Sequence, residues 1–263
     1  MIRNVLITIF IGVFMISCIP KKDLVYFQGK PRVVKAVNRA VDKSYQLQVN
    51  DIIDVKIKAE DSKLVSLFNR TESQNLQGTN QFTPESLYFS SYSIDTQGNI
   101  RLPYLGTLNV LGYTEKQVRE KIEVELGKFF KDVSDIFVTV KLAGIRFTVL
   151  GEVGLPGTVV LFQNQVSIIE AIANAGDITL TGDRKRVVIM RENMEGAKKI
   201  TLNLTDASVF NSAYFYIQPN DIIYVEPLKQ KSWGTGTTGA QTFSTLISVL
   251  SLVTTTILLV RNL

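Results

Sequence analysis

Residues 145–177 read IRFTVLGEVGLPGTVVLFQNQVSIIEAIANAGD. Two β-branched stretches flank the turn sequence at 154–157, which predicts a pair of strands joined by a turn. Ser167 and Glu170 have the spacing of a capping box, the pattern that begins a helix, and Gly176 is typical of the residue that follows a helix end. A strand pair followed directly by a capped helix is therefore predicted.

Later residues complete this unit. The stretches 186–191 and 198–204 predict a second strand pair around Glu-Asn-Met-Glu-Gly, and 222–227 predicts a closing strand. Strand pair, helix, strand pair and closing strand follow one another in the order of a β-grasp domain, which we place at 145–227. The predicted fold class of the chain is α+β.

An earlier unit is predicted over 44–144. Its first strand is expected at 44–58, where polar and β-branched residues alternate, and its last strand at 136–142. Thr114, with a Gln three residues later, forms a second capping box before a helix expected at 115–130. The apolar stripe of this helix contains Val118, Ile122, Leu126 and Phe129.

Two parts of this earlier unit are expected to be irregular. The polar stretch 61–91 predicts a long loop or insertion. Gln97-Gly98-Asn99 predicts the turn of a hairpin, followed by a strand interrupted by Pro and Gly.

The tetrapeptide Asn-Asp-Ile-Ile occurs twice, at 50–53 and at 220–223, with a Gln two residues before each Asn. We interpret both copies as turns in which Asn and Asp side chains bond the backbone, each leading into a buried strand whose two Ile residues enter the core. One copy opens the first unit and the other closes the second. Asp51 and Asp221 are therefore predicted to be structural and not catalytic.

The composition excludes several kinds of chemistry. The chain of 263 residues has no His and one Cys, which rules out His-based catalysis, His metal sites, an internal disulfide and a thiolate metal cluster. No cofactor is expected. The net charge of +5 is concentrated in 21–43, where seven Lys/Arg stand against two Asp, and residues from Ser44 onward sum to −1. Nucleic acid is therefore not an expected partner.

The N-terminus predicts export and lipid attachment. Residues 1–17 carry one positive residue, Arg3, and then twelve apolar residues from 5 to 16, which is too short for a membrane span and typical of a signal peptide. Met-Ile-Ser-Cys resembles the lipobox of bacterial lipoproteins, in which Cys18 would be acylated. The alternative is an ordinary signal peptide, or an anchor with a buried Cys. Residues 18–43 are then a basic tether beside the lipid, either solvated or held at an anionic surface.

The C-terminal end predicts a transmembrane helix at 241–261, preceded by a Gly/Thr-rich linker at 228–240. Residues 242–260 carry no charge, and as a helix they would extend about 29 Å, close to the ~30 Å of a hydrocarbon core. One face, which we call the hydroxyl stripe, carries Ser244, Ser248, Ser251 and Thr255. The opposite face, predicted to contact lipid, carries Leu246, Leu250, Val253, Ile257 and Val260.

Three interpretations of the hydroxyl stripe remain open. It can line a water-filled pore, or it can be a seam between packed helices, since small hydroxyl residues let backbones approach closely. Both require other copies of the chain and therefore predict an oligomer. In the third interpretation the helix is a lone anchor whose hydroxyls bond its own backbone.

The chain resembles the polysaccharide biosynthesis/export lipoproteins, the Wza-like family, in two stretches. These are GNIRLPYLGTLNVLGYTEKQVREKIEVEL at 98–126 and FTVLGEVGLPGTVVLFQNQVSIIEAIANAGD at 147–177. The resemblance implies an export domain at 44–144 and a soluble-ligand-binding β-grasp (SLBB) domain at 145–227. It also implies a ring of identical subunits, an octamer in the family, whose C-terminal helices form a barrel through the outer membrane.

The resemblance further implies partners and a location. Capsular or exopolysaccharide would be the cargo, passed from periplasm to cell surface, and an inner-membrane polysaccharide copolymerase or tyrosine kinase would be a partner. The globular domains would lie in the periplasm, attached to membrane lipid.

Two other classes of protein stay open. One is an adaptor lipoprotein that binds a glycan or a partner without a pore, and the other is an enzyme. The chain is not expected to be an enzyme, because a lone carboxylate is usually a helix cap or a solvated group. The carboxylates considered for that role are Glu152, Glu170, Asp177 and Asp183.

Overall fold

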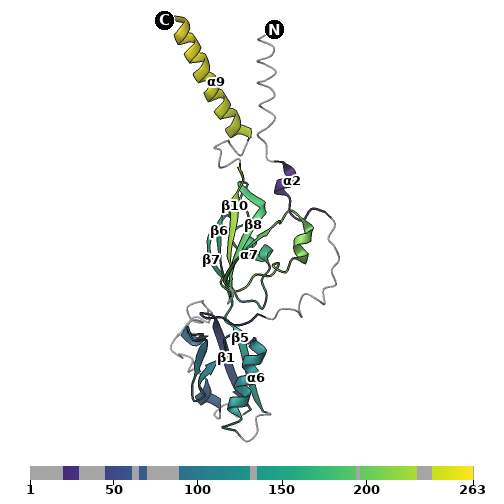
Figure 1. Cartoon of the computed structure of the whole chain (residues 1–263), viewed down its shortest axis with the longest axis vertical. Helices are drawn as coiled ribbons and strands as arrows, with labels where there is room; N and C mark the ends of the chain where they lie inside the picture. Colours follow the sequence, from purple (N-terminus) through teal and green to yellow (C-terminus); the bar gives the residue numbers. More distant parts are fainter. Residues whose placement is uncertain are drawn as a thin grey trace.

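The computed structural model describes residues 20–29, 45–60, 65–69, 89–130, 135–193, 196–229 and 239–262. A first domain, which begins at residue 45, and a second domain, which begins at residue 145, are stacked end to end (Figure 1). A long C-terminal helix extends from the end of the second domain that faces away from the first.

The second domain is built on one mixed sheet in the strand order β7-β6-β10-β8-β9. Its strands are β6 (Ile145–Gly151), β7 (Gly157–Leu161), β8 (Gly182–Asn193), β9 (Gly196–Leu202) and β10 (Ile222–Pro227). β6 pairs with β7 and β8 pairs with β9 as antiparallel hairpins. β10 lies between the hairpins, parallel to β6 and antiparallel to β8, which is the arrangement of a β-grasp. The mixed α+β class is confirmed.

Helix α7 (Ile168–Asn174) begins and ends where the sequence predicts. Ser167 accepts a hydrogen bond from the Glu170 amide and the Glu170 side chain accepts one from the Ser167 amide, so the capping box is complete. Gly176 has a φ of 77°, a left-handed conformation that is strained for residues with a side chain. The helix therefore stops after two turns.

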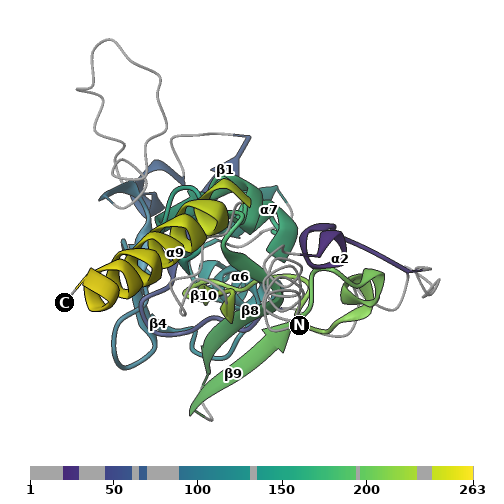
Figure 2. The same cartoon turned by 90° about the horizontal axis from the view of Figure 1, so that it is seen from above.

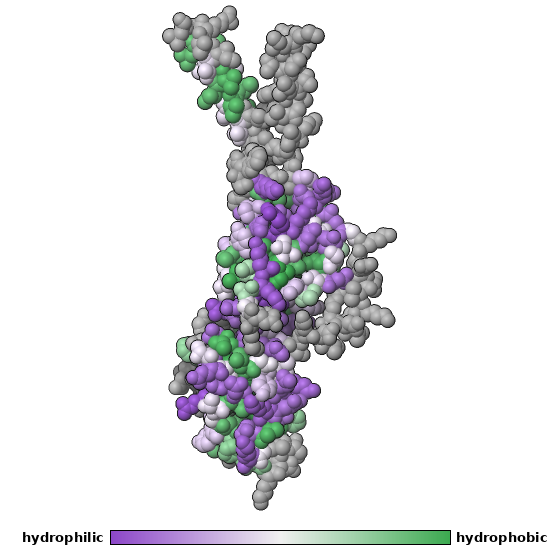
Figure 3. Space-filling view, in the orientation of Figure 1, coloured by the Kyte–Doolittle hydropathy of each residue, from purple (hydrophilic) through white to green (hydrophobic). Residues whose placement is uncertain are grey.

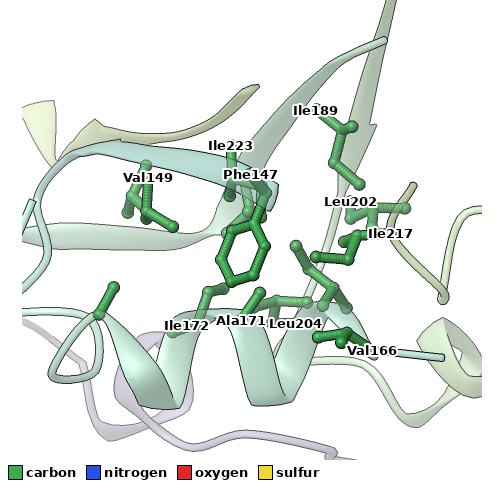
Figure 4. Close-up of a cluster of buried hydrophobic side chains, with 14 of the residues drawn as sticks. Phe147, Val149, Val166, Ala171, Ile172, Ile189, Leu202, Leu204, Ile217 and Ile223 are labelled. Carbon is green, nitrogen blue, oxygen red and sulfur yellow. The ribbon is translucent and has the colours of Figure 1, made fainter. Parts of the chain in front are cut away.

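The core of the second domain lies between α7 and the sheet. Phe147, Val149 and Ile223 point from the strands toward Ala171 and Ile172 of the helix (Figure 4). All five are essentially buried. Burial of this apolar surface, at about 25 cal/mol per Å², is what holds the helix against the sheet.

The first domain combines a sheet, a hairpin and one long helix. The sheet has the order β2-β1-β5, and β3 pairs with β4 in a separate hairpin. The strands are β1 (Ile52–Ala59), β2 (Tyr92–Ser93), β3 (Asn99–Leu102), β4 (Gly106–Asn109) and β5 (Ile136–Leu142). Helix α6 (Glu115–Leu126) begins at the predicted capping box of Thr114 and Gln117. Its buried residues are Val118, Ile122 and Leu126.

Three predictions for the first domain are wrong in detail. The first strand begins at Ile52 and not at 44, because the preceding residues form a turn. Helix α6 ends at Leu126 and not at 130, so Phe129 lies beyond the helix and is 55% exposed. The hairpin turns at 103–105, because the turn around Gly98 joins β2 to β3, which do not pair with each other.

Part of the stretch predicted as a loop or insertion belongs to the core. The short 3-10 helix η1 (Ser66–Phe68) buries Phe68, and Val65 before it is also buried. The Asn69 side chain donates to the Ile57 carbonyl at 2.8 Å and accepts from the Ile57 amide at 2.9 Å. This side chain therefore occupies the place of a neighbouring strand. Residues 61–64 and 70–88 lie outside the described part of the chain.

Residues 20–29, which we call the strap, were expected to be tether and instead bind the second domain. The strap contains the short helix α2 (Lys21–Leu24). The Phe27 amide donates to the Leu204 carbonyl at 3.1 Å and the Gln28 amide to the Thr205 carbonyl at 2.6 Å. These contacts lie just before the 3-10 helix η2 (Ala207–Asn211), whose first residue donates back to the Gln28 carbonyl. Cys18 and residues 30–44 lie outside the described residues.

The C-terminal helix α9 (Gly239–Asn262) is inclined across the end of the molecule when seen from above (Figure 2). Apolar residues gather on it, whereas polar residues cover much of the two domains (Figure 3). Of the helices in the described part of the chain, none is both long and apolar enough to cross a membrane. The transmembrane prediction for 241–261 is therefore not supported by the structure, although the segment is helical.

Candidate functional site

The hydroxyl stripe of α9 bonds to its own backbone. Ser248 Oγ donates to the Ser244 carbonyl at 2.9 Å, and Thr255 Oγ1 donates to the Ser251 carbonyl at 2.7 Å. A hydroxyl that donates in this way keeps its oxygen as an acceptor. The stripe can therefore face water, a sugar hydroxyl or another helix without leaving these two donors unsatisfied.

Large apolar residues border the hydroxyl stripe on both sides. At about 100° per residue, Ile247 and Leu258 lie within ~80° of the stripe centre on one side, and Leu252 and Leu259 on the other. The structure leaves all four exposed. A helix in a ring needs this arrangement, because it must contact one neighbour on each side while the stripe between them faces inward.

The face predicted to contact lipid is only partly described. Leu250 and Val253 are exposed on the side of α9 opposite the stripe. The side chains of Leu246, Ile257 and Val260 lie outside the described residues, as does Cys18. The assignment of this face to lipid stays a prediction.

Two of the four carboxylates considered for an enzyme have clear structural roles. Glu170 caps α7, and the hydrogen bonds from Ser167 hold the pKa of its carboxyl below the usual value. Asp183 accepts from the Lys185 amide at 2.9 Å and pairs with Arg186 at 3.0 Å. These groups stabilise a helix start and a strand start.

The other two carboxylates also have partners from nearby loops. Asp177 accepts from the Tyr26 hydroxyl at 2.5 Å, and Glu152 accepts from the hydroxyls of Thr179 and Thr181. Among the described residues, no group of three or more Cys, Asp or Glu side chains is placed to hold a metal ion. The four carboxylates therefore supply no assembled catalytic centre.

The two Asn-Asp-Ile-Ile copies form the same turn. Asn50 and Asn220 have φ values of 68° and 65°, in the left-handed region that Asn tolerates better than most residues. In both copies the Asp carboxylate accepts, at 2.8 Å, from the amide of the Gln three residues earlier. The predicted bonding of these side chains to the backbone is confirmed for Asp51 and Asp221.

Only one Ile of each copy enters a core, which corrects the prediction that both do. Ile53 and Ile223 are fully buried, whereas Ile222 is 42% exposed. Consecutive residues of a strand point to opposite faces, so two adjacent Ile side chains cannot both face the same core.

A buried ion pair anchors the second turn. Arg191 on β8 donates to both carboxylate oxygens of Asp221, from Nε at 2.9 Å and from Nη2 at 2.7 Å. The two side chains are 9% and 0% exposed. Arg191 also donates to the Tyr216 carbonyl at 3.2 Å and lies over the Tyr214 ring at 5.4 Å. The guanidinium therefore compensates a carboxylate that water does not reach.

The two turns meet where the domains meet. Asp51 accepts from the Tyr45 hydroxyl at 2.8 Å, and Asn220 Nδ2 of the second domain lies 3.5 Å from its other oxygen, at the outer limit of a hydrogen bond. Burial raises the pKa of Asp51, and burial together with the Asp51 carboxylate raises the pKa of Tyr45. The repeated tetrapeptide indicated two turns, but the sequence carried no sign that they adjoin.

The comparisons with protein families assign both domains. Residues 39–143 match the model described as polysaccharide biosynthesis/export protein, and residues 145–225 match that of the SLBB domain. The two together define the class of polysaccharide export proteins that carry an SLBB domain. The chain therefore carries a polysaccharide biosynthesis/export domain followed by an SLBB domain, which fits the Wza-like family that its sequence resembles.

Two curated relatives carry the same name, EPS I polysaccharide export outer membrane protein EpsA. The protein from Ralstonia nicotianae is 31% identical over 140 residues, which cover 52% of this chain and 36% of the relative. The protein from Ralstonia solanacearum is 30% identical over 139 residues, again 52% of this chain and 36% of the relative. The match therefore spans about a third of each relative. The family is one of transport components and not of enzymes.

Proposed function

We propose that this chain forms a ring-shaped channel that carries capsular or exopolysaccharide from the periplasm across the outer membrane to the cell surface. The observation that carries the proposal is helix α9, with a hydroxyl stripe bordered on both sides by exposed apolar residues. The cargo and the membrane follow from the family and from the names of the two relatives.

In this proposal α9 enters the outer membrane as one wall of a barrel. A helix in such a wall contacts lipid on one side only, so it need not be as apolar as a helix that crosses a membrane alone. The uncharged stretch 242–260 favours this role, since its helix would extend about 29 Å. An octamer with helices ~10 Å apart would have a ring about 25 Å across at the helix axes, leaving ~13 to 15 Å inside. A hydrated glycan chain fits such an opening.

The hydroxyl stripe suits passage better than retention. Ser and Thr oxygens offer weak hydrogen bonds to any sugar hydroxyl, and a strong binding site would hold the cargo instead of releasing it. An inner-membrane polysaccharide copolymerase is the partner that would deliver the polysaccharide to the periplasmic side of the channel.

Export itself tests the proposal. Cells that lack this protein should lose surface polysaccharide, and the full-length chain should restore it. Cells without the protein that display a normal amount of polysaccharide would contradict an export role. Restoration by a chain that stays monomeric in detergent would instead favour the adaptor lipoprotein.

The proposal also includes acylation of Cys18. The lipid can be attached only through the thiol of this residue. Cys18→Ser is expected to yield a precursor that retains the signal peptide, takes up no metabolic lipid label and does not reach the outer membrane. Ser17→Ala, which keeps the thiol, should label as wild type does. Unchanged labelling of Cys18→Ser would remove the lipobox assignment.

A further inference from the structure

The strap is held to the second domain by side chains as well as by its backbone. Tyr26 donates its hydroxyl to Asp177 at 2.5 Å, and its ring lies under the Arg184 guanidinium at 5.1 Å. Burial and this hydrogen bond raise the pKa of Tyr26 to about 12. The hydroxyl is therefore a neutral donor to a carboxylate at physiological pH.

Contacts on either side of Tyr26 extend this attachment. Asp23 pairs with Lys185 at 2.6 Å, and the Phe27 ring packs against the Phe210 ring at a tilt of 40°, with centroids 5.0 Å apart. Gln28 Nε2 donates to two carbonyls within the strap itself, which keeps the segment folded. The strap is thus a structured element with an ion pair, a half-buried tyrosine and a contact between two aromatic rings, and not a solvated linker.

The strap binds at one particular end of the second domain. Arg184 and Lys185 lie near the start of β8, where Gly182 is opposite Pro227 at the end of β10. Helix α9 follows β10 in the chain and leaves from the same end (Figure 1). Strap and α9 therefore share the end of the molecule opposite the first domain.

This attachment changes the reach of a lipid anchor. A free tether from residue 18 to residue 45 would have a mean span of about 30 Å and a limit of ~90 Å. The strap begins at Pro20, only two residues after Cys18. The distance from Cys18 to the strap, which is bound to the second domain, is therefore at most ~7 Å. A lipid on Cys18 would therefore lie beside this end of the domain.

We propose that the strap is a clamp that holds the second domain directly against the lipid surface, at the end from which α9 departs. The proposal rests on the proposed acylation of Cys18. It identifies the membrane as the partner of this end of the domain and assigns the contact to the strap, with Tyr26 as its central residue.

Energy transfer between the protein and lipid headgroups tests the clamp in the full-length chain. Acylation consumes the single native Cys, so Leu180→Cys, an exposed position before β8, supplies a unique thiol for a donor dye. Lys128→Cys, just after α6 in the first domain, supplies the distant reference. Both proteins are reconstituted into phosphatidylethanolamine/phosphatidylglycerol vesicles with acceptor-labelled headgroups.

The donor at 180 should lie close to the vesicle surface and the donor at 128 far from it. Adding Tyr26→Ala should move the donor at 180 outward by roughly 15 Å, the mean span of a nine-residue linker, because residues 230–238 before α9 and a freed tether then set the distance. Lys185→Glu, on the surface of the folded domain, should move it less but in the same direction. Val25→Ala, an exposed strap residue, should leave it unchanged.

The outcomes distinguish a failure of the proposed acylation of Cys18 from a failure of the proposed clamp. If the protein without an added Cys takes up dye, Cys18 carries a free thiol, and both the acylation and the clamp that depends on it are wrong. If Cys18 is blocked by lipid and neither Tyr26→Ala nor Lys185→Glu moves the donor, the channel proposal stands and the clamp is wrong.

Discussion

Leu250→Arg is expected to abolish the proposed channel, with loss of surface polysaccharide. Leu250 lies on the face of α9 opposite the hydroxyl stripe and near the middle of 242–260. A charge toward lipid at this depth costs on the order of 2.5 to 3.5 kcal/mol, and every subunit of a ring bears that cost. The measurements are the amount of protein in the outer membrane and the amount of surface polysaccharide. Leu250→Ile, which keeps the face apolar, should behave as wild type does.

Ser251→Arg, at the neighbouring position but about 100° around the helix, is expected to give a different result. If the hydroxyl stripe lines the proposed lumen, an arginine on it would face water, so the ring should still form while ion conductance or glycan passage changes. Ring recovery and bilayer conductance are measured for both variants. Equal loss of rings in both would show that the stripe is a packing seam and would contradict its assignment to the lumen.

Arg191→Met is expected to destabilise the second domain by about 3 to 5 kcal/mol, the second large effect. The substitution keeps much of the length of the side chain but leaves Asp221, which is fully buried, without its cation. Thermal unfolding of the detergent-solubilised chain measures the loss.

Two variants separate the buried charge from other causes. Arg186→Met removes a cation from the same strand, but Arg186 is 42% exposed and its ion pairs with Asp183 and Glu226 lie at the surface. This substitution should therefore lower the free energy of unfolding by less than about 1 kcal/mol. Adding Asp221→Asn to Arg191→Met removes the uncompensated charge and should restore much of the stability. A double variant as unstable as Arg191→Met would show that packing of the arginine matters more than its charge.

Local features of this fold can be predicted from the sequence because they depend on neighbouring residues. Both capping boxes, the left-handed Gly176 and the bonding of Asp51 and Asp221 to their turns each involve residues at most a few positions apart. The β-grasp order followed from the alternation of hairpins and helix. These signals predicted most ends of the strands and helices to within a few residues. The exceptions are the start of β1, which a turn precedes, and the end of α6, which stops at Leu126.

Contacts between distant residues could not be predicted in the same way. The strap pairs Tyr26 with Asp177, 151 positions away, whereas the basic composition of 18–43 indicated a tether that is either solvated or held at an anionic surface. Two aromatic residues in that stretch were the available sign of packing. Arg191 and Asp221 are 30 positions apart, so no local pattern marks them as a pair. Exposure of the apolar flanks of α9 likewise became clear only from the structure.

Electron microscopy of the full-length protein, extracted from outer membranes in detergent, tests the central claim most directly. We expect ring-shaped particles in end views, with the α9 helices gathered around a central opening of ~13 to 15 Å if the ring is an octamer. Particles of a single subunit or a small open oligomer, from preparations that still carry the lipid, would contradict a channel and favour an adaptor lipoprotein.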